Sequence, residues 1–129
     1  MSIIGHGVDI VEVERIRTAL QRNGDRFHQR TCTAGEAAYC LAMKDPAPFF
    51  AARFAAKEAV SKALGTGIGP QCSWLDIEVR RKASGEPFVV LHGAGAETAK
   101  RLGIARILLS LSHTENYAVA QAIAVSDPA

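Results

Sequence analysis

A stretch of alanines in the middle of the chain limits the possible folds more than any other feature. Residues 47–64 read APFFAARFAAKEAVSKAL, and Gly65 follows directly. A proline near the start and a glycine just beyond the end are typical helix boundaries, so we predict a helix over about residues 48–64. On a helical wheel both faces of this helix are apolar or small. We therefore expect a sheet to cover one face, and a ligand or another subunit to cover the other.

Two charged side chains, Glu58 and Lys62, lie one turn apart on the second face of this predicted helix. Charges in such a crowded setting are costly to bury without a partner. One interpretation is an ordinary Glu–Lys helix pair, worth about 0.2–0.5 kcal/mol. The other is that both groups are placed for a ligand. The pattern alone leaves both interpretations open.

The remaining sequence predicts further helices and strands around this helix. An amphipathic helix over about residues 12–21 should end near Asn23–Gly24, and Thr33 with Glu36 forms a capping-box pattern for a helix that runs to about Met43. A last helix is expected over residues 94–102. Alternating apolar residues predict strands over residues 3–13, 75–82, 87–91, 105–112 and 117–125. This order indicates an α+β fold, with a mixed or antiparallel sheet wrapped around the long Ala-rich helix.

Size and charge limit the class of protein. A chain of 129 residues with 48% hydrophobic content is expected to form one compact domain, residues 1–129. The formal charge of +2 and pI of about 8.6 are too mild for a nucleic-acid-binding protein. The basic residues are nevertheless uneven, because five arginines and only one acidic residue, Asp25, fall within residues 15–30.

The cysteines and the N-terminus indicate a cytoplasmic protein. Three cysteines, Cys32, Cys40 and Cys72, match neither a zinc site nor a small disulfide framework, and we expect reduced thiols. Residues 1–10 lack the features of a signal peptide, and no apolar run approaches the length that crosses a bilayer. We therefore expect neither secretion nor membrane insertion.

Other candidate functional residues lie near the two ends of the chain. In the first predicted strand Asp9 shares a side with Gly5 and Gly7, so either something approaches this backbone closely or Asp9 caps the next helix. The glycine-rich segment 65–70 follows a helix and fits neither nucleotide-binding loop motif, which favours a helix cap and linker. His113 precedes the turn of the last hairpin, where a lone histidine is more often structural. The four histidines have no spacing typical of a metal cluster.

Four motifs in this order resemble the holo-acyl-carrier-protein synthase family, the small trimeric 4'-phosphopantetheinyl transferases. The resemblance spans almost the whole chain. The motifs are G-x-G-V-D-I-V-E-V-E-R-I from Gly5, T-x-x-E at Thr33 and Glu36, R-F-A-A-K-E-A-V-S-K-A-L from Arg53, and S-L-S-H-T from Ser110. The chain departs from the family pattern at Thr114, where some relatives carry Asp, so we leave Thr114 out of the site.

The resemblance implies transfer of the phosphopantetheine arm of coenzyme A to a serine of an acyl carrier protein, with release of adenosine 3',5'-bisphosphate, in fatty acid biosynthesis. By this resemblance Asp9 and Glu58 hold Mg²⁺, whose preference for hard oxygen ligands suits them. Lys62 contacts the phosphates and stabilises or protonates the leaving oxygen. Glu58 is the candidate base for the carrier serine, directly or through water. His113 and Gly65 lie near the coenzyme A nucleotide.

The resemblance also implies partners. Arg15, Arg22 and Arg26 would dock an acidic carrier protein, although a solvated basic face is the simpler alternative. The family further implies a homotrimer with sites between protomers. Two other function classes stay open at this point, a Mg²⁺-dependent hydrolase of nucleotide pyrophosphates and a non-enzymatic coenzyme A binding module.

Overall fold

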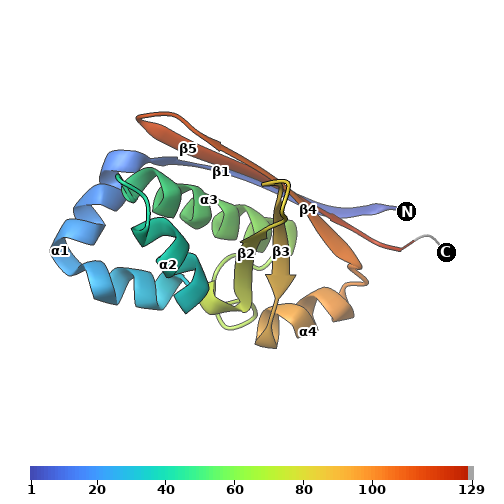
Figure 1. Cartoon of the computed structure of the whole chain (residues 1–129). Coiled ribbons are helices and arrows are strands. Elements are labelled where there is room, and N and C mark those ends of the chain that lie inside the picture. Colours follow the sequence, from blue (N-terminus) through green and yellow to red (C-terminus); the bar gives the residue numbers. More distant parts are fainter. Residues whose placement is uncertain (128–129) are drawn as a thin grey trace.

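A three-stranded sheet and a long helix that crosses one of its faces form the centre of the protein. The computed structural model describes residues 1–127. The sheet has the order β1 (Ile3–Glu12), β5 (Tyr117–Val125) and β4 (Arg106–His113). Both strand pairs are antiparallel, so the predicted class is confirmed, with antiparallel pairing throughout this sheet. Helix α3 (Ala47–Ala63) runs along the sheet (Figure 1). Ser2 and Ser126, near the two ends of the described chain, are joined by a backbone hydrogen bond of 2.9 Å.

Small side chains allow α3 to lie unusually close to the sheet. Along α3, the alanines at 51, 55, 56 and 59 are fully buried, and the inward positions of β5 are also alanines. On β1 the inward positions include Gly5 and Gly7. A Cβ atom at Gly7 would overlap the carbonyl oxygen of Ala59, and one at Gly5 would overlap that of Ala63. The group that approaches the glycines is therefore α3.

The first helix is longer than the sequence predicted. Helix α1 spans Val13–Thr31 and continues past the expected stop at Asn23–Gly24, with a kink at Asn23 (φ −145°, ψ 51°). The second half of α1 packs on α3, where Phe27 stacks on Phe54 with 6.3 Å between ring centroids and His28 stacks on Phe50 at 5.8 Å. This tertiary packing restarts the helix after a local stop signal.

The other elements lie close to their predicted positions. Helix α2 (Ala34–Leu41) begins with the predicted capping box, in which Thr33 and Glu36 bond each other's backbone, and ends two residues before Met43. A short 3-10 turn, η1 (Trp74–Asp76), leads into a separate hairpin of β2 (Ile77–Arg81) and β3 (Pro87–Leu91), followed by α4 (Gly93–Arg101). Gly65 has φ +80° and follows α3 as the predicted cap, before the linker.

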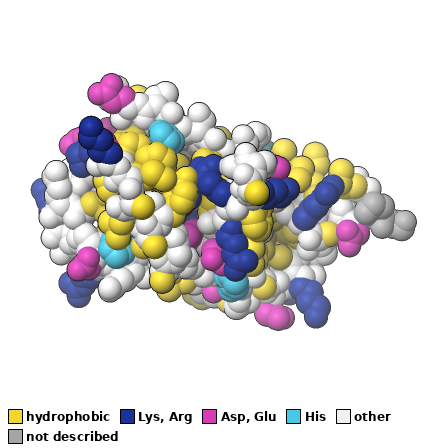
Figure 2. Space-filling view, in the orientation of Figure 1, with side chains coloured by type: hydrophobic (Ala, Val, Ile, Leu, Met, Phe, Trp, Pro, Cys, Tyr) yellow, Lys and Arg dark blue, Asp and Glu magenta, His cyan; other side chains and the backbone are white. Residues whose placement is uncertain are grey.

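The two faces of the three-stranded sheet differ. The inner face is covered by α3, but the outer face exposes large hydrophobic side chains, namely Val8 (57% exposed), Ile10 (64%), Leu108 (44%), Tyr117 (50%) and Val119 (39%). The face of the molecule shown in Figure 2 carries hydrophobic side chains over α2, with Lys and Arg side chains beside them over the β2–β3 hairpin. None of the helices within residues 1–127 is long and apolar enough to cross a membrane.

The cysteines are buried free thiols, as predicted. Burial raises the pKa of the Cys40 thiol to about 12 and that of Cys72 to about 11. These thiols therefore stay protonated near neutral pH and are poor nucleophiles and metal ligands.

Candidate active site

Asp9 points from β1 toward α3. The alternation of the strand buries Gly7 and Val11 and turns Val8 and Ile10 outward, so Asp9 shares the inner face, with its side chain 19% exposed. Asp9 does not cap α1, because that position is Glu12, which makes no side-chain cap hydrogen bond. The interpretation of Asp9 as a helix cap is wrong.

Lys62 reaches across from α3 to this part of β1. Its Nζ donates to the carbonyl oxygen of Val8 at 3.0 Å and lies 3.5 Å from Oδ1 of Asp9. Among the ion pairs of residues 1–127, Asp9 is the acidic partner of Lys62, and Glu58 forms none. The interpretation of Glu58 and Lys62 as an ordinary helix pair is therefore wrong. The Lys62 side chain is 50% exposed, which leaves its ammonium group accessible to a ligand.

Glu58 lies half-buried at the same edge of α3. Burial raises the pKa of its carboxyl above the usual range, and the negative charge of Asp9 raises it further, while Lys62 and Arg15 oppose the shift. No hydrogen bond within residues 1–127 uses the Glu58 carboxylate. Two carboxylates on different elements therefore repel each other beside one ammonium group. Such a pair stabilises a bound cation, because a cation between the carboxylates removes the repulsion.

His113 lies away from this group within one chain. It is at the end of β4, which is separated from β1 by β5, and its ring packs edge-on against Phe49 with 5.0 Å between centroids. Two strand spacings amount to roughly 10 Å. The structure therefore brings Asp9, Glu58 and Lys62 together and places His113 at the opposite edge of the sheet.

Gly65 and Arg15 lie near the three charges, and Arg22 and Arg26 lie farther away. Gly65 follows Leu64, the C-cap of α3, and its N–H donates to the carbonyl of Lys62 at 2.9 Å. Arg15 lies over the Phe54 ring at 5.4 Å, and its positive charge opposes the rise in the pKa of Glu58. Arg22 and Arg26 line an open cavity of about 530 Å³ farther along α1. All three arginines are exposed on α1, and Arg15 is the one nearest the carboxylates.

Comparison with known proteins decides the family. Residues 5–122 match the family model described as the 4'-phosphopantetheinyl transferase superfamily. The chain belongs to this superfamily. It is 51% identical over 121 residues to the holo-[acyl-carrier-protein] synthase of Koribacter versatilis, with 94% of this chain and 97% of that protein covered. It is 50% identical over 122 residues to a Chlamydia trachomatis protein of the same name, with 95% and 99% covered.

Solved structures of such synthases share the fold of this transferase. The Neisseria meningitidis holo-[acyl-carrier-protein] synthase has a TM-score of 0.90 at 34% identity, and 97% of this chain and 100% of that chain are covered. The Bacillus anthracis synthase, in complex with CoA (3',5'-ADP), has a TM-score of 0.81 at 39% identity, with 97% and 98% covered. The family expected from the four motifs is confirmed.

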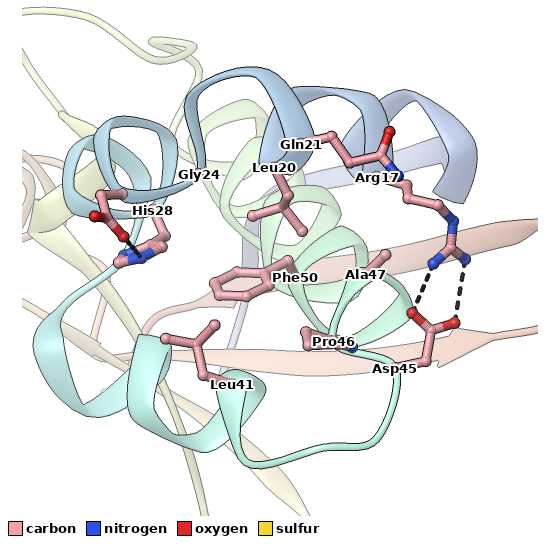
Figure 3. A pocket seen from close by; sticks show the side chains of 11 residues that line it. Arg17, Leu20, Gln21, Gly24, His28, Leu41, Asp45, Pro46, Ala47 and Phe50 are labelled. Atoms are coloured by element: carbon pink, nitrogen blue, oxygen red, sulfur yellow. Dashed lines mark hydrogen bonds and ion pairs between the residues drawn. The ribbon is translucent and has the colours of Figure 1, made fainter.

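A separate apolar pocket of about 260 Å³ lies between α1, α2 and the start of α3 (Figure 3). Leu20, Leu41 and Phe50 point into it. Arg17 and Asp45 form a bidentate ion pair at its rim, with N–O distances of 2.6 and 3.1 Å. None of the candidate site residues discussed above lines this pocket. The pocket is therefore distinct from the candidate active site.

Sequence reasoning missed the buried charges of α3. Lys57 and Glu36 form an ion pair with a 2.8 Å N–O distance, and their side chains are 0% and 1% exposed. Arg53 is 2% exposed and lies over the Tyr39 ring at 4.3 Å. Both basic residues lie among alanines and aromatics in the R-F-A-A-K-E motif, and this unusual context was the available signal. Their partners come from α2, which the sequence alone does not place beside α3.

Proposed function

We propose that this protein transfers the 4'-phosphopantetheine group of coenzyme A to a serine of an apo acyl carrier protein, releasing adenosine 3',5'-bisphosphate, as a step that serves fatty acid biosynthesis. The observation that carries the proposal is the convergence of Asp9, Glu58 and Lys62 at one edge of β1 and α3. Close relatives named holo-[acyl-carrier-protein] synthase support it. So does the Helicobacter pylori synthase, solved in complex with coenzyme A, with a TM-score of 0.83 at 31% identity.

The two carboxylates fit Mg²⁺. Mg²⁺ commonly takes one or two protein carboxylates and completes its octahedral shell with water and ligand phosphates. Asp9 and Glu58 supply such a donor set, and the Glu58 carboxylate makes no competing hydrogen bond among the described residues. When bound, Mg²⁺ would polarise the coenzyme A pyrophosphate and neutralise developing negative charge.

Glu58 and Lys62 have complementary roles in the proposed reaction. Glu58 accepts the proton of the carrier serine hydroxyl, directly or through a water molecule. The Lys62 ammonium has three N–H donors, of which one bonds Val8 and one is directed at Asp9. The third is available to a phosphate oxygen. Lys62 thereby stabilises or protonates the leaving oxygen of adenosine bisphosphate.

Arg15, Arg22 and Arg26 dock the acidic carrier protein. All three lie on α1, and Arg15 is the one whose charge reaches Glu58. A basic surface that starts at the catalytic acid and continues along one helix steers an acidic partner toward the reacting groups.

The assembly is a homotrimer with sites shared between protomers. Its support is the exposed hydrophobic outer face of the sheet, since such faces mark protein interfaces. A second support is the position of His113 at the sheet edge opposite Asp9. A neighbouring protomer supplies His113, which binds the coenzyme A nucleotide beside Gly65. The compartment is the cytoplasm, where three free thiols remain reduced.

One incubation tests this function. The protein is mixed with coenzyme A, Mg²⁺ and an apo acyl carrier protein, and both products are followed by mass spectrometry. We expect the carrier to gain one phosphopantetheine group while adenosine 3',5'-bisphosphate is released. Breakdown of coenzyme A with an unmodified carrier would instead indicate a pyrophosphate hydrolase, and no change in either would indicate a binding module.

A further inference from the structure

A buried network of charge joins four elements around Lys57. Its Nζ donates to Oε1 of Glu36 at 2.8 Å and to the carbonyl oxygen of Trp74 at 3.1 Å. Glu36 also accepts from the backbone N–H of Thr33 at 2.8 Å and from that of Val79 at 2.9 Å. The network therefore connects α3 with α2, η1 and β2, and every contact in it is directional.

Stability alone does not account for this network. Removing two charges from water is expensive, and replacing a buried ion pair by well-packed neutral side chains often leaves stability unchanged or higher. The Lys57 and Glu36 side chains are 0% and 1% exposed, so both charges bear the full free-energy cost of removal from water. The role that buried pairs serve best is to fix one arrangement among several of similar energy.

The face of α3 that meets the sheet allows such alternatives, because its surface is smooth. Most of the buried positions of α3 are alanines, namely Ala47, Ala51, Ala52, Ala55, Ala56, Ala59 and Ala63. Side chains of similar small size on one face distinguish poorly between small rotations of the helix about its axis. Directional contacts supply the discrimination that this face lacks, and the Lys57 network lies in the middle of the helix.

Rotation of α3 decides where the candidate catalytic groups point. Consecutive residues of a helix are about 100° apart around the axis, so Glu58 lies about 100° and Lys62 about 140° from Lys57. With Lys57 held by Glu36, Glu58 and Lys62 point toward Asp9 on β1. We propose that Lys57, held by Glu36, is a positioning residue that sets the rotation of α3 at which Glu58 and Lys62 meet the substrate. This inference rests on the proposed transferase function.

The test compares variants of full-length protein in the carrier-modification assay at a temperature well below unfolding. Lys57→Met/Glu36→Gln removes both charges together, so no unpaired charge stays buried, and the introduced glutamine amide keeps an oxygen for the Val79 N–H. We expect kcat to fall at least tenfold, while KM for coenzyme A changes less than threefold. A small misplacement of reacting groups lowers the rate far more than ground-state binding.

A matched control separates positioning from loss of stability. Ile16, 1% exposed on α1 and outside the network, is changed to Ala to lower the unfolding temperature while every hydrogen bond of Lys57 and Glu36 is kept. We expect Ile16→Ala to keep the wild-type kcat at the assay temperature. If the double variant does not fold, it is combined with Gly35→Ala, which adds helix propensity to α2 without a new close contact, and kcat and KM are measured in the same way, with the same selective loss of kcat expected.

Each outcome supports or overturns the inference. A folded double variant with wild-type kcat would overturn it, as would an equal loss of kcat in Ile16→Ala. Wild-type protein is assayed beside the variants. If the wild type fails to modify the carrier, the proposed function fails. If the wild type is active and the variants match it, only the positioning role fails.

Discussion

Side-chain charges at the edge of β1 and α3 are only partly balanced. Asp9 and Glu58 are both acidic, and within residues 1–127 Lys62 forms an ion pair with Asp9 alone. The Glu58 pKa is raised both by burial and by Asp9. A raised carboxyl pKa with an identifiable charged cause is typical of functional sites. This arrangement therefore supports the proposed binding of a cation and phosphates at this edge.

Changing Asp9 to Asn should lower the pKa of Glu58. Loss of the Asp9 charge removes the second cause of the upward shift, while burial remains. The measurement is an NMR titration of the Glu58 carboxyl carbon in the protein without added metal. Asp45→Asn, which removes an acid paired with Arg17 elsewhere, is the control and should leave Glu58 unchanged. An unshifted Glu58 titration in Asp9→Asn would show that the two acids do not interact.

Glu58→Gln should not destabilise the protein at neutral pH. Because the folded-state pKa of Glu58 is raised, the folded protein holds this proton more tightly than the unfolded chain. The charged form is thus penalised above the raised pKa, and the penalty disappears as the pH falls below the ordinary value of 4.5. We expect the variant to have an equal or slightly higher Tm at pH 7 and no advantage at pH 4. A large loss of Tm at pH 7 would contradict this.

Much of the residue-scale site could be predicted from sequence periodicity. Strand alternation places Asp9 with Gly5 and Gly7, and helix periodicity places Glu58 beside Lys62. What periodicity could not show is that Lys62 pairs with Asp9 rather than Glu58. The Lys57–Glu36 ion pair was not predicted for the same reason, because the two residues are 21 positions apart in the sequence and meet only through tertiary packing.

At the scale of elements, the close contact between β1 and α3 depends on glycines, which have no side chain to separate the strand from the helix. Gly7 faces both the Ala59 carbonyl and the Cβ of Lys62, so any larger residue must push the two elements apart. Since Asp9 lies on β1 and Glu58 and Lys62 on α3, this contact also sets the spacing of the candidate site. The glycines of the first motif are therefore explained by packing that positions the charges.

The same substitution should have opposite effects at two glycines. Gly7→Ala should lower the free energy of unfolding by about 1–3 kcal/mol or more, because of overpacking against backbone. Gly35→Ala, in α2 with nothing within 4 Å of the added Cβ, should raise it by about 0.5–1 kcal/mol through helix propensity. Urea unfolding of both variants is the measurement. Similar effects at the two positions would contradict the close-contact explanation.

Element boundaries were predictable wherever local signals and packing agree. The capping box of α2 and the glycine after α3 marked their ends because each satisfies the backbone locally. The Asn23–Gly24 signal produced a kink, not an end, since Phe27 and His28 gain aromatic partners on α3. Such partners are visible only in the folded chain.

At the scale of the whole molecule, the outer face of the sheet stands out because it is hydrophobic and yet exposed to solvent. Its exposed large hydrophobics come from all three strands. The sequence predicted the alternation of these strands, yet it could not show that β1 and β4 form opposite edges of one sheet. That topology separates His113 from Asp9 within one chain and is the reason for the proposal that the site is shared between protomers.

A charge on this face should break the assembly. Val119→Lys places an ammonium on the central strand β5, whose Val119 side chain is 39% exposed in the single chain. Burying an unpaired charge at an interface is costly, so we expect sedimentation to show monomers and transfer activity to be lost with the trimer. Leu102→Lys, at the 40% exposed C-cap of α4, is the control and should leave both unchanged. A trimeric, active Val119→Lys protein would exclude this face as the interface.

The proposed reaction is tested most directly by comparing the rates at which wild-type and Glu58→Ala proteins load phosphopantetheine onto an apo acyl carrier protein. The rate is read from the mass of the carrier, and thermal unfolding is recorded for both proteins. A positioned general base contributes roughly 10²–10⁴-fold, so we predict at least a hundredfold loss in Glu58→Ala. The unfolding temperatures should agree, since the Glu58 carboxylate makes no hydrogen bond in the described chain. Near-wild-type loading by folded Glu58→Ala would contradict the claim that this carboxylate, beside Asp9 and Lys62, carries the reaction.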